Sequence, residues 1–377
     1  MPQTSLFHTS IRLTPISPRN LLRNLHLDVP LLTGLLLLAL LSFVILYSSG
    51  GQKIEVVLRQ AGRLGLATLV MMTIAQIPPR YFQLYSPFLY MACLILLTAV
   101  MLAGKVSLGA QRWLDLGVIR FQPSEMTKLG MPMMIAWFMA QQSRIPQAFD
   151  IAVAGLLILI PSAMIAKQPD LGTALLVGTA GAAVLFLAGI SRVYILTLLL
   201  MGASVLPVAW HFLHAYQRDR ILTFLNPESD PLGRGYHIIQ SKIAIGSGGI
   251  YGKGWLAGTQ SHLEFLPERS TDFIFAVFAE EFGLLGCFVL LAIYLFILAR
   301  CLYIVVEARE RYNRLLSGSL TLVFFVYIFV NIGMVIGILP VVGVPLPLIS
   351  YGGTSMVTLM AGFGMLMSIH THRKRYS

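Results

Sequence analysis

Long apolar runs separated by short polar connections dominate the chain. A helix needs about 20 apolar residues to cross a bilayer, and continuous runs of that length recur from residue 30 onward. The pattern predicts ten spanning helices, at about 30–49, 56–77, 86–104, 123–141, 150–166, 170–190, 193–212, 272–300, 316–339 and 350–370.

Two connections between these spans differ from the rest. Only Lys167-Gln168-Pro169-Asp170 separates the fifth span from the sixth, so this stretch is either a tight turn or the break in a discontinuous helix. Residues 213–271 instead form one large polar loop, which runs into the eighth span at Asp272. Within that loop, residues 236–245 have the pattern of a short amphipathic helix resting on the membrane surface. The polar groups that could carry chemistry are therefore concentrated around one loop.

Composition supports a membrane protein. Of the 377 residues, 56% are apolar and 11% charged, whereas soluble domains carry about 25% charged residues. We therefore expect an all-α polytopic membrane protein with about ten transmembrane helices. One membrane domain (28–371) is expected, between an N-terminal segment (1–27) and a basic tail (372–377), with no cleavable signal peptide. The three cysteines have no disulfide or metal spacing, and no nucleotide or organic cofactor is indicated.

The distribution of charge predicts the orientation. Ten spans place both chain ends on one side, and basic residues in short loops mark the cytoplasmic side. The large 213–271 loop and the 105–122 loop are then extracytoplasmic. The net charge of +11 reports topology and contact with anionic lipid rather than nucleic acid. The basic residues on the side of the termini are Arg12, Arg19, Arg23, Arg80, Arg144, Arg192, Arg300, Arg309, Arg311, Arg314, Arg373, Lys374 and Arg375.

Asp272 is the first candidate for chemistry. It lies where the large loop meets an apolar helix, which suits a carboxylate acting on a substrate that is partly lipid and partly sugar or phosphate. The alternative interpretation is that Asp272 is a structural acid in the first turn of that helix, with Ser270 or Thr271 as the cap. Glu280 lies about 80° further around the helix and about 12 Å deeper, where it could line the same cavity.

Ionisable residues near the other extracytoplasmic span ends are further candidates, because charge at membrane depth usually faces a cavity or a partner. Glu125 and Lys128 share a helix face and form either a self-neutralised structural pair or part of a site. Arg112, in an amphipathic interfacial segment, suits phosphate or a lipid headgroup. Asp170 either caps the sixth span or faces a cavity. The proline- and glycine-rich stretch 344–353 indicates a broken segment at membrane depth, which must line a cavity or lie buried.

One glycine-rich stretch imitates a phosphate-binding loop. In Gly246–Gly254 the first glycine of the P-loop pattern is replaced by Ser247, and Lys253 is followed by glycine rather than serine or threonine. The stretch therefore fails the pattern, and we expect its glycines to allow tight turns.

The chain resembles the SEDS family (shape, elongation, division and sporulation proteins), and within it the RodA branch of Gram-negative bacteria. The resemblance implies ten transmembrane helices in the bacterial cytoplasmic (inner) membrane. It also implies polymerisation of lipid II into undecaprenyl-linked glycan outside that membrane, with a class B penicillin-binding transpeptidase and other elongation-complex proteins as partners. The motifs that carry it are Gly109–Asp115, Phe121–Lys128, Gln168–Thr173, Asp219–Asp230, Gly233–Trp255, Phe265–Glu281 and Gly337–Gly353.

The family's essential aspartate corresponds to Asp272, and the resemblance implies that Glu125, Lys128 and Asp170 line the cavity below it. As a hypothesis, Asp272 is either the base in an inverting glycosyl transfer or a residue that organises a divalent cation, Mg or Mn, on the pyrophosphate. The second acid, Glu125 or Glu280, need not act in the chemistry. Candidate pyrophosphate partners are Arg112, Lys128, Arg218, Arg220, Lys242 and Arg269.

Two other functions remain open. A lipid II flippase or transporter would use Glu125, Lys128 and Asp170 as gating groups. A non-catalytic scaffold for cell-wall assembly would need no carboxylate at position 272.

Overall fold

The structure, a computed structural model, describes residues 26–107, 110–115, 120–142, 145–197, 234–259 and 268–372, with a few single positions between 200 and 223. Every expected span has a matching helix except 193–212, which lies mostly outside the described residues, as does much of the 213–271 loop. The helices are α2 Val29–Ser49, α3 Ile54–Ala75, α4 Pro79–Ala103, α5 Pro123–Gln141, α6 Ala148–Lys167, α7 Leu171–Leu187, α10 Arg234–Gly248, α12 Ile274–Glu307, α13 Arg311–Ile336 and α14 Thr354–Thr371.

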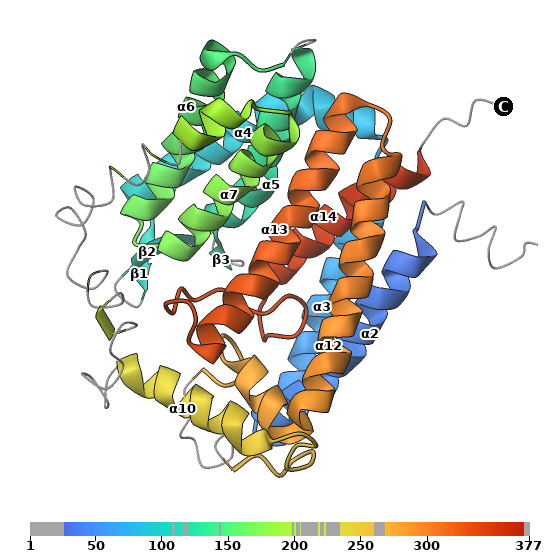
Figure 1. The fold of residues 1–377 in the computed structure, drawn as a ribbon, viewed down its shortest axis with the longest axis vertical. Helices are drawn as coiled ribbons and strands as arrows, with labels where there is room; N and C mark the ends of the chain where they lie inside the picture. The colour runs from blue at the N-terminus through green and yellow to red at the C-terminus, as the bar shows by residue number, and fades with distance from the viewer. Residues whose placement is uncertain are drawn as a thin grey trace, which may run out of the picture.

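The molecule is an all-helical polytopic membrane protein, as expected. Helices α2, α4, α6, α12 and α13 are each long and apolar enough to cross a bilayer, and α7 is a shorter apolar helix of 17 residues. At about 1.5 Å per residue, 20 residues span the hydrocarbon core of about 30 Å. The helix α10 confirms the helix predicted at 236–245 and lies across one end of the bundle, against α12 and α13 (Figure 1).

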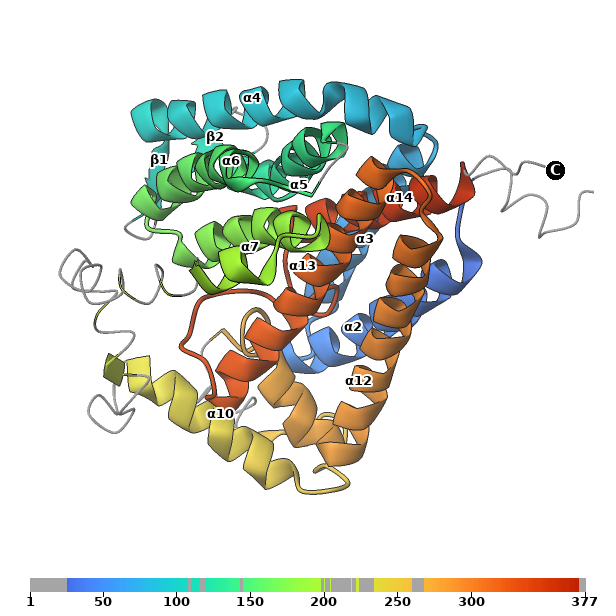
Figure 2. The same ribbon diagram turned by 45° about the horizontal axis from the view of Figure 1, so that its top comes forward.

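The spanning helices form two groups that meet at α13. Helices α4 to α7 lie together on one side, and α2, α3, α12 and α14 lie on the other (Figure 2). Helix α13 packs against α5 and α7 of the first group and against α12 and α14 of the second. It is largely buried along its length, which explains why its polar side chains can reach both groups.

The stretch after Lys167 is a tight turn between antiparallel helices. Helices α6 and α7 pack side by side, and a Cβ built on Gly181 would lie 2.5 Å from Cγ1 of Ile158. Gly178 similarly faces Ser162, at 3.6 Å. The alternative of one discontinuous helix is therefore wrong.

The segment between α4 and α5 differs from expectation. It holds three short antiparallel strands in the order β1-β2-β3: Lys105–Ser107, Ala110–Asp115 and Arg120–Phe121. The expected amphipathic interfacial segment at 109–115 is thus the central strand of a small sheet. This strand pairs with neighbouring strands of only three and two residues. Such strands are too short to show the alternation of apolar and polar residues by which a strand is recognised in a sequence.

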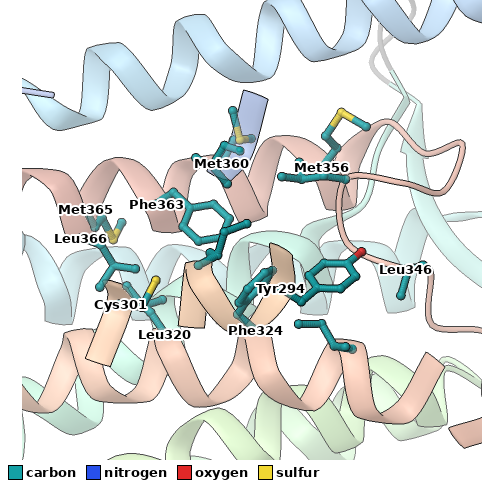
Figure 3. Close-up of a cluster of buried hydrophobic side chains, with 14 of the residues drawn as sticks. Tyr294, Cys301, Leu320, Phe324, Leu346, Met356, Met360, Phe363, Met365 and Leu366 are labelled. Atoms are coloured by element: carbon teal, nitrogen blue, oxygen red, sulfur yellow. The ribbon is translucent and has the colours of Figure 1, made fainter. Parts of the chain in front are cut away.

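Aromatic and methionine side chains from α12, α13 and α14 fill the core of the bundle (Figure 3). The rings of Phe324 and Phe363 meet edge to face at 5.1 Å between centroids. Tyr294 is 1% exposed and packs beside Phe324, and its hydroxyl donates to the backbone oxygen of Pro347 at 2.7 Å. The core thereby holds the irregular segment that precedes α14.

Helix α12 is interrupted at Gly283, whose φ of 63° and ψ of −164° are not helical. A break in a helix leaves backbone N–H and C=O groups without helical partners, which is costly away from water. The segment Gly249–Gly254 supplies the missing partners. The bonds run from N of Lys253 to O of Glu280 (3.0 Å), from N of Gly254 to O of Glu281 (3.0 Å), from N of Leu284 to O of Gly249 (3.0 Å) and from N of Leu285 to O of Ile250 (3.1 Å).

This docking explains the glycine-rich stretch. A Cβ on Gly248 would lie 2.1 Å from the backbone oxygen of Ala279, and one on Gly252 would lie 2.1 Å from the backbone oxygen of Glu281. Backbone therefore meets backbone at distances that only glycine permits. The glycines do permit turns, since Gly249, Gly252 and Gly254 have positive φ, but their larger role is contact with the broken helix.

Candidate functional site

Asp272 lies in a turn just before α12, not in the helix itself. The helix begins at Ile274, its cap position is Phe273, and no side chain makes a capping bond there. The structural alternative, an acid in the first helical turn with a serine or threonine cap, is therefore wrong. The turn 268–273 is bent sharply at Glu268, whose φ is 54°.

A cavity of about 190 Å³ opens beside Asp272. Gly343 borders the carboxylate, since a Cβ there would lie 3.5 Å from Oδ2 of Asp272. Gly343 is exposed and has a φ of 79°, so the segment passes close to the acid without covering it with a side chain. The cavity is lined by Thr223, His237, Ile238, Glu268, Asp272, Phe273 and Val341.

Three contacts fasten the Asp272 turn to the segment 343–353. Asn331, fully buried in α13, donates from Nδ2 to the backbone oxygens of Asp272 (2.9 Å) and Val344 (2.7 Å). The hydroxyl of Ser350 donates to the backbone oxygen of Thr271 at 2.6 Å. The backbone N–H of Tyr351 donates to the oxygen of Ser270 at 2.8 Å. The broken segment predicted at 344–353 thus lies against the Asp272 turn.

His237 of α10 shares the cavity with two acids. Its ring stacks on Phe273, with centroids 5.7 Å apart. Burial lowers the pKa of His237 below its usual 6.5, and the nearby Glu268 opposes that shift. The imidazole is therefore neutral near pH 7 and can exchange hydrogen bonds with sugar hydroxyl groups without adding charge.

Glu125 and Lys128 form a buried ion pair in the first two turns of α5. Nζ of Lys128 lies 2.7 Å from Oε1 of Glu125 and 2.6 Å from the hydroxyl of Tyr327 on α13. Oε2 of Glu125 accepts no hydrogen bond from the described residues. The pair is thus tied to the helix that also carries Asn331, and both of its members are about 6–7% exposed at the side chain.

Asp170 caps α7 and anchors a second polar cluster. Its Oδ1 accepts from the backbone N–H of Thr173 at 3.3 Å, and its Oδ2 accepts from Nε2 of Gln122 at 3.1 Å. Arg112 lies 4.0 Å from Asp170 and donates to the backbone oxygens of Gln168 (3.2 Å) and Pro169. Arg112 therefore binds the end of α6 in this structure.

The segment 341–344 connects this cluster with Asp272. A Cβ on Gly172, at the start of α7, would lie 2.9 Å from the backbone oxygen of Val342. Val341 lines the Asp272 cavity and Gly343 borders the acid. Asp170 and Asp272 thus lie on either side of one short stretch of backbone.

Four of the remaining candidates, Arg218, Lys242, Arg269 and Glu280, are not among the described residues that line the cavity, and the fifth, Arg220, lies outside the described residues. Lys242 is exposed and packs over Gly337, at the end of α13 where a cation suits the helix dipole. Arg269 extends toward Gly51 in the α2–α3 turn. Glu280, which we expected to line the same cavity, is fully buried on another side of α12. There its Oε1 accepts from Lys253 at 2.7 Å and from Thr259 at 3.1 Å.

Asn331, Tyr327 and His237 were not singled out by the sequence. A usable signal existed for the first two, because isolated polar residues inside an apolar span generally face the protein interior. No such signal marks His237, which lies in a helix recognisable only as amphipathic.

The described residues contain no group of three or more His, Cys, Asp or Glu side chains that could hold a metal ion. Asp272 and Glu268 nevertheless line one cavity, and Mg²⁺ is commonly bound through one or two carboxylates together with substrate phosphates. The expectation of a divalent cation on the pyrophosphate is compatible with these residues and stays a prediction.

These features define a polytopic helical membrane protein with a carboxylate cavity at one end of its bundle. The chain belongs to the family of cell cycle proteins that comprises FtsW, RodA and SpoVE, whose model matches residues 22–375. It is 54% identical over 353 residues to the peptidoglycan glycosyltransferase MrdB of Escherichia coli (strain K12), covering 93% of this chain and 95% of that protein. It is 36% identical to MrdB of Helicobacter pylori (strain J99 / ATCC 700824), covering 93% and 91%.

Solved structures show the same fold. A chain from a peptidoglycan synthase complex, described as coordinating polymerization and crosslinking, matches with a TM-score of 0.80 and 35% identity, over 92% of this chain and 98% of that one. The rod shape determining protein RodA of Thermus thermophilus matches with a TM-score of 0.70 and 28% identity, over 93% and 98%. The expected family and fold are confirmed.

Proposed function

We propose that this chain joins lipid-linked sugars at the cavity beside Asp272, polymerising lipid II on the extracytoplasmic face of the bacterial inner membrane, with both chain termini in the cytoplasm. The chain is a peptidoglycan glycosyltransferase. The observation that supports this site is the placement of Asp272, a carboxylate on a turn held by hydrogen bonds to α13 and to the segment 343–353, at a cavity at one end of the helix bundle.

In the proposed reaction the 4-hydroxyl of the acceptor lipid II attacks the anomeric carbon of the growing strand. A bond forms from that oxygen to carbon, the bond from carbon to the pyrophosphate oxygen breaks, and undecaprenyl pyrophosphate leaves with the electron pair. Attack opposite the leaving group inverts the anomeric centre. Asp272 takes the hydroxyl proton, and the leaving group needs none, so a second catalytic acid is unnecessary.

The surrounding residues act on orientation and charge. Neutral His237 offers hydrogen bonds to the acceptor sugar. The charge of Lys128 is neutralised by Glu125. Lys128 can therefore contribute to pyrophosphate binding only if this ion pair separates, or if the substrate reaches the Tyr327 hydroxyl that Lys128 contacts. A divalent cation held by Asp272 or Glu268 would supply charge neutralisation of the pyrophosphate.

The similarity to a chain of a peptidoglycan synthase complex supports a partner. A class B penicillin-binding transpeptidase would crosslink the strands that this chain polymerises, and elongation-complex proteins would direct the pair.

The test is polymerisation of fluorescent lipid II by the purified protein, with and without the transpeptidase and across a series of Mg²⁺ and Mn²⁺ concentrations. Asp272→Ala should remain folded and membrane-inserted yet form no polymer. Glu55→Gln, which changes an exposed acid of α3, should behave as the unaltered protein. Full activity in Asp272→Ala would exclude the site. Lipid II scrambling in vesicles without polymer would favour a flippase, and normal rod shape in a strain carrying Asp272→Ala would favour a scaffold.

A further inference from the structure

A second cavity lies at the opposite end of the bundle from Asp272. Its volume is about 410 Å³, within the usual range of small-molecule sites, about 300–1,000 Å³. Asn313 in its wall and Asn331 at the Asp272 turn are 18 positions apart on α13 (331 − 313), which is about 27 Å along a helix. The cavity thus lies about one hydrocarbon thickness away, at the headgroup level of the other leaflet. The polar residues of its lining that matter here are Arg80, Glu307, Arg309, Glu310 and Asn313.

The walls of this cavity are held in place. Ser368 of α14 donates to the backbone oxygen of Ile77, which ties α14 to the α3–α4 turn. The hydroxyls of Ser86 and Tyr312 lie 2.9 Å apart and tie α4 to α13. Because each wall is fastened to another, the cavity is preformed.

Its charges are of both signs. Arg80 and Arg309 face Glu307 and Glu310 around one space. Asn313 is 9% exposed, and its Oδ1 accepts no hydrogen bond from the described residues. A ligand of a single sign would meet like charge on one wall, whereas a zwitterion would find a partner for each of its ends.

An apolar surface continues from this cavity along α4. The guanidinium of Arg80 lies 4.9 Å from the ring centroid of Tyr81. Tyr81, Tyr85 and Phe88 are 38%, 55% and 68% exposed and follow one another on one helix face. A molecule bound at Arg80 can therefore extend apolar chains along this face toward the hydrocarbon core.

We propose that this cavity binds the headgroup of a phosphoethanolamine lipid from the leaflet on the side of the chain termini. Arg80 and Arg309 hold the phosphate, for which the planar guanidinium is suited. Glu307 and Glu310 accept hydrogen bonds from the ammonium, and such charge-assisted bonds are the strong ones. A phosphocholine group has no N–H to donate, and a phosphoglycerol group has no cation, so both bind less well.

Native mass spectrometry of the purified chain tests this site. The protein is given an equimolar mixture of phosphatidylethanolamine, phosphatidylcholine and phosphatidylglycerol with identical acyl chains, and the bound lipids are counted. Phosphatidylethanolamine should be retained preferentially, and soluble phosphoethanolamine should compete with it. Glu307→Gln should reduce the preference by about tenfold, the effect of one lost charge-assisted hydrogen bond to the ammonium. Arg309→Ala should instead reduce the retention of all three lipids by a similar factor, because all three carry the phosphate.

The matched control is Arg314→Ala, an exposed residue near the start of α13 that does not line the cavity; it should keep both the preference and the total lipid retention. Equal retention of the three lipids by the unaltered protein, an unchanged preference in Glu307→Gln, or unchanged retention in Arg309→Ala would overturn the proposal. Lipid retention is read without any polymerisation assay, so the result is independent of the function proposed for Asp272.

Discussion

Asn331 holds the backbone of Asp272 through a side-chain hydrogen bond of 2.9 Å, across 59 positions of sequence. The same Nδ2 also donates to Val344 at 2.7 Å, so one buried amide fixes the candidate base relative to the segment that borders it. Buried carbonyl groups without a partner cost about 1–3 kcal/mol each, and this pairing therefore matters for geometry as well as stability.

Asn331→Leu should lower lipid II polymerisation by about tenfold or more, because a carboxylate displaced by a fraction of an ångström loses its productive geometry. Thr321→Val is the control on the same helix. It also removes a buried hydrogen bond, but that bond ends on the backbone of Ser317 within α13. Both variants are compared for thermal stability and for polymerisation rate. Equal rates at equal stability would show that Asn331 does not position Asp272.

The Glu125–Lys128 pair should respond asymmetrically to substitution. Lys128→Met leaves a buried carboxylate unpaired, which typically costs about 3–5 kcal/mol. The double variant Glu125→Gln with Lys128→Met removes both charges and should recover most of that loss. Thermal unfolding of both variants in detergent measures the difference. A double variant that is stable but inactive would place the pair in the reaction, whereas activity restored by reversing both charges would make it structural.

Gly248→Ala should fail to accumulate as folded protein, because its Cβ would be placed 2.1 Å from the backbone oxygen of Ala279. Gly246→Ala is a closely matched control in the same helix, since nothing lies within 4 Å of its Cβ. Alanine is favoured over glycine in a helix by about 1 kcal/mol, so the control should be neutral or slightly stabilising. Similar yields and unfolding temperatures for the two variants would contradict the docking of this segment on α12.

Acid should destabilise the region around His237. The folded-state pKa of this residue lies below its unfolded value of about 6.5 because burial penalises the charged ring. The unfolded chain then binds more protons between those two pKa values, so stability is full above about pH 6.5 and falls as the pH drops toward the folded pKa. His237→Asn should show a smaller loss of unfolding temperature between pH 7 and pH 5. Identical pH profiles would mean that Glu268 and Asp272 offset the burial.

Much of the fold could be predicted because membrane helices are encoded locally. Continuous apolar runs located the helices, and α5 was predicted at its observed bounds, 123–141. The sheet at 105–121 was missed because its strands are held by hydrogen bonds to one another. Pairing of this kind leaves no pattern within any one of these short strands.

The candidate site was predicted less completely than the fold. Asp272 was recognised from its position and from the family motif. Glu280 was expected in its cavity because an ideal helix places position 280 near that face, but burial against Lys253 and Thr259 decides where that carboxylate points. Asn331 contacts the backbone of Asp272 across 59 positions of sequence, and the ring of His237 stacks on Phe273 across 36 positions (273 − 237). A periodic pattern reports neighbours within one helix or strand, so it could not reveal these contacts.

The break at Gly283 also constrains the order of biosynthesis. The segment Gly249–Gly254 that completes α12 is translated before α12 itself, so its N–H and C=O groups are available when the broken helix forms. Insertion of α12 alone would carry open carbonyls into hydrocarbon, at a cost of several kcal/mol per group. The first stretch of this helix therefore has these hydrogen-bond partners only after the preceding segment has docked on it, so the helix that follows Asp272 and the segment before it depend on each other for stability.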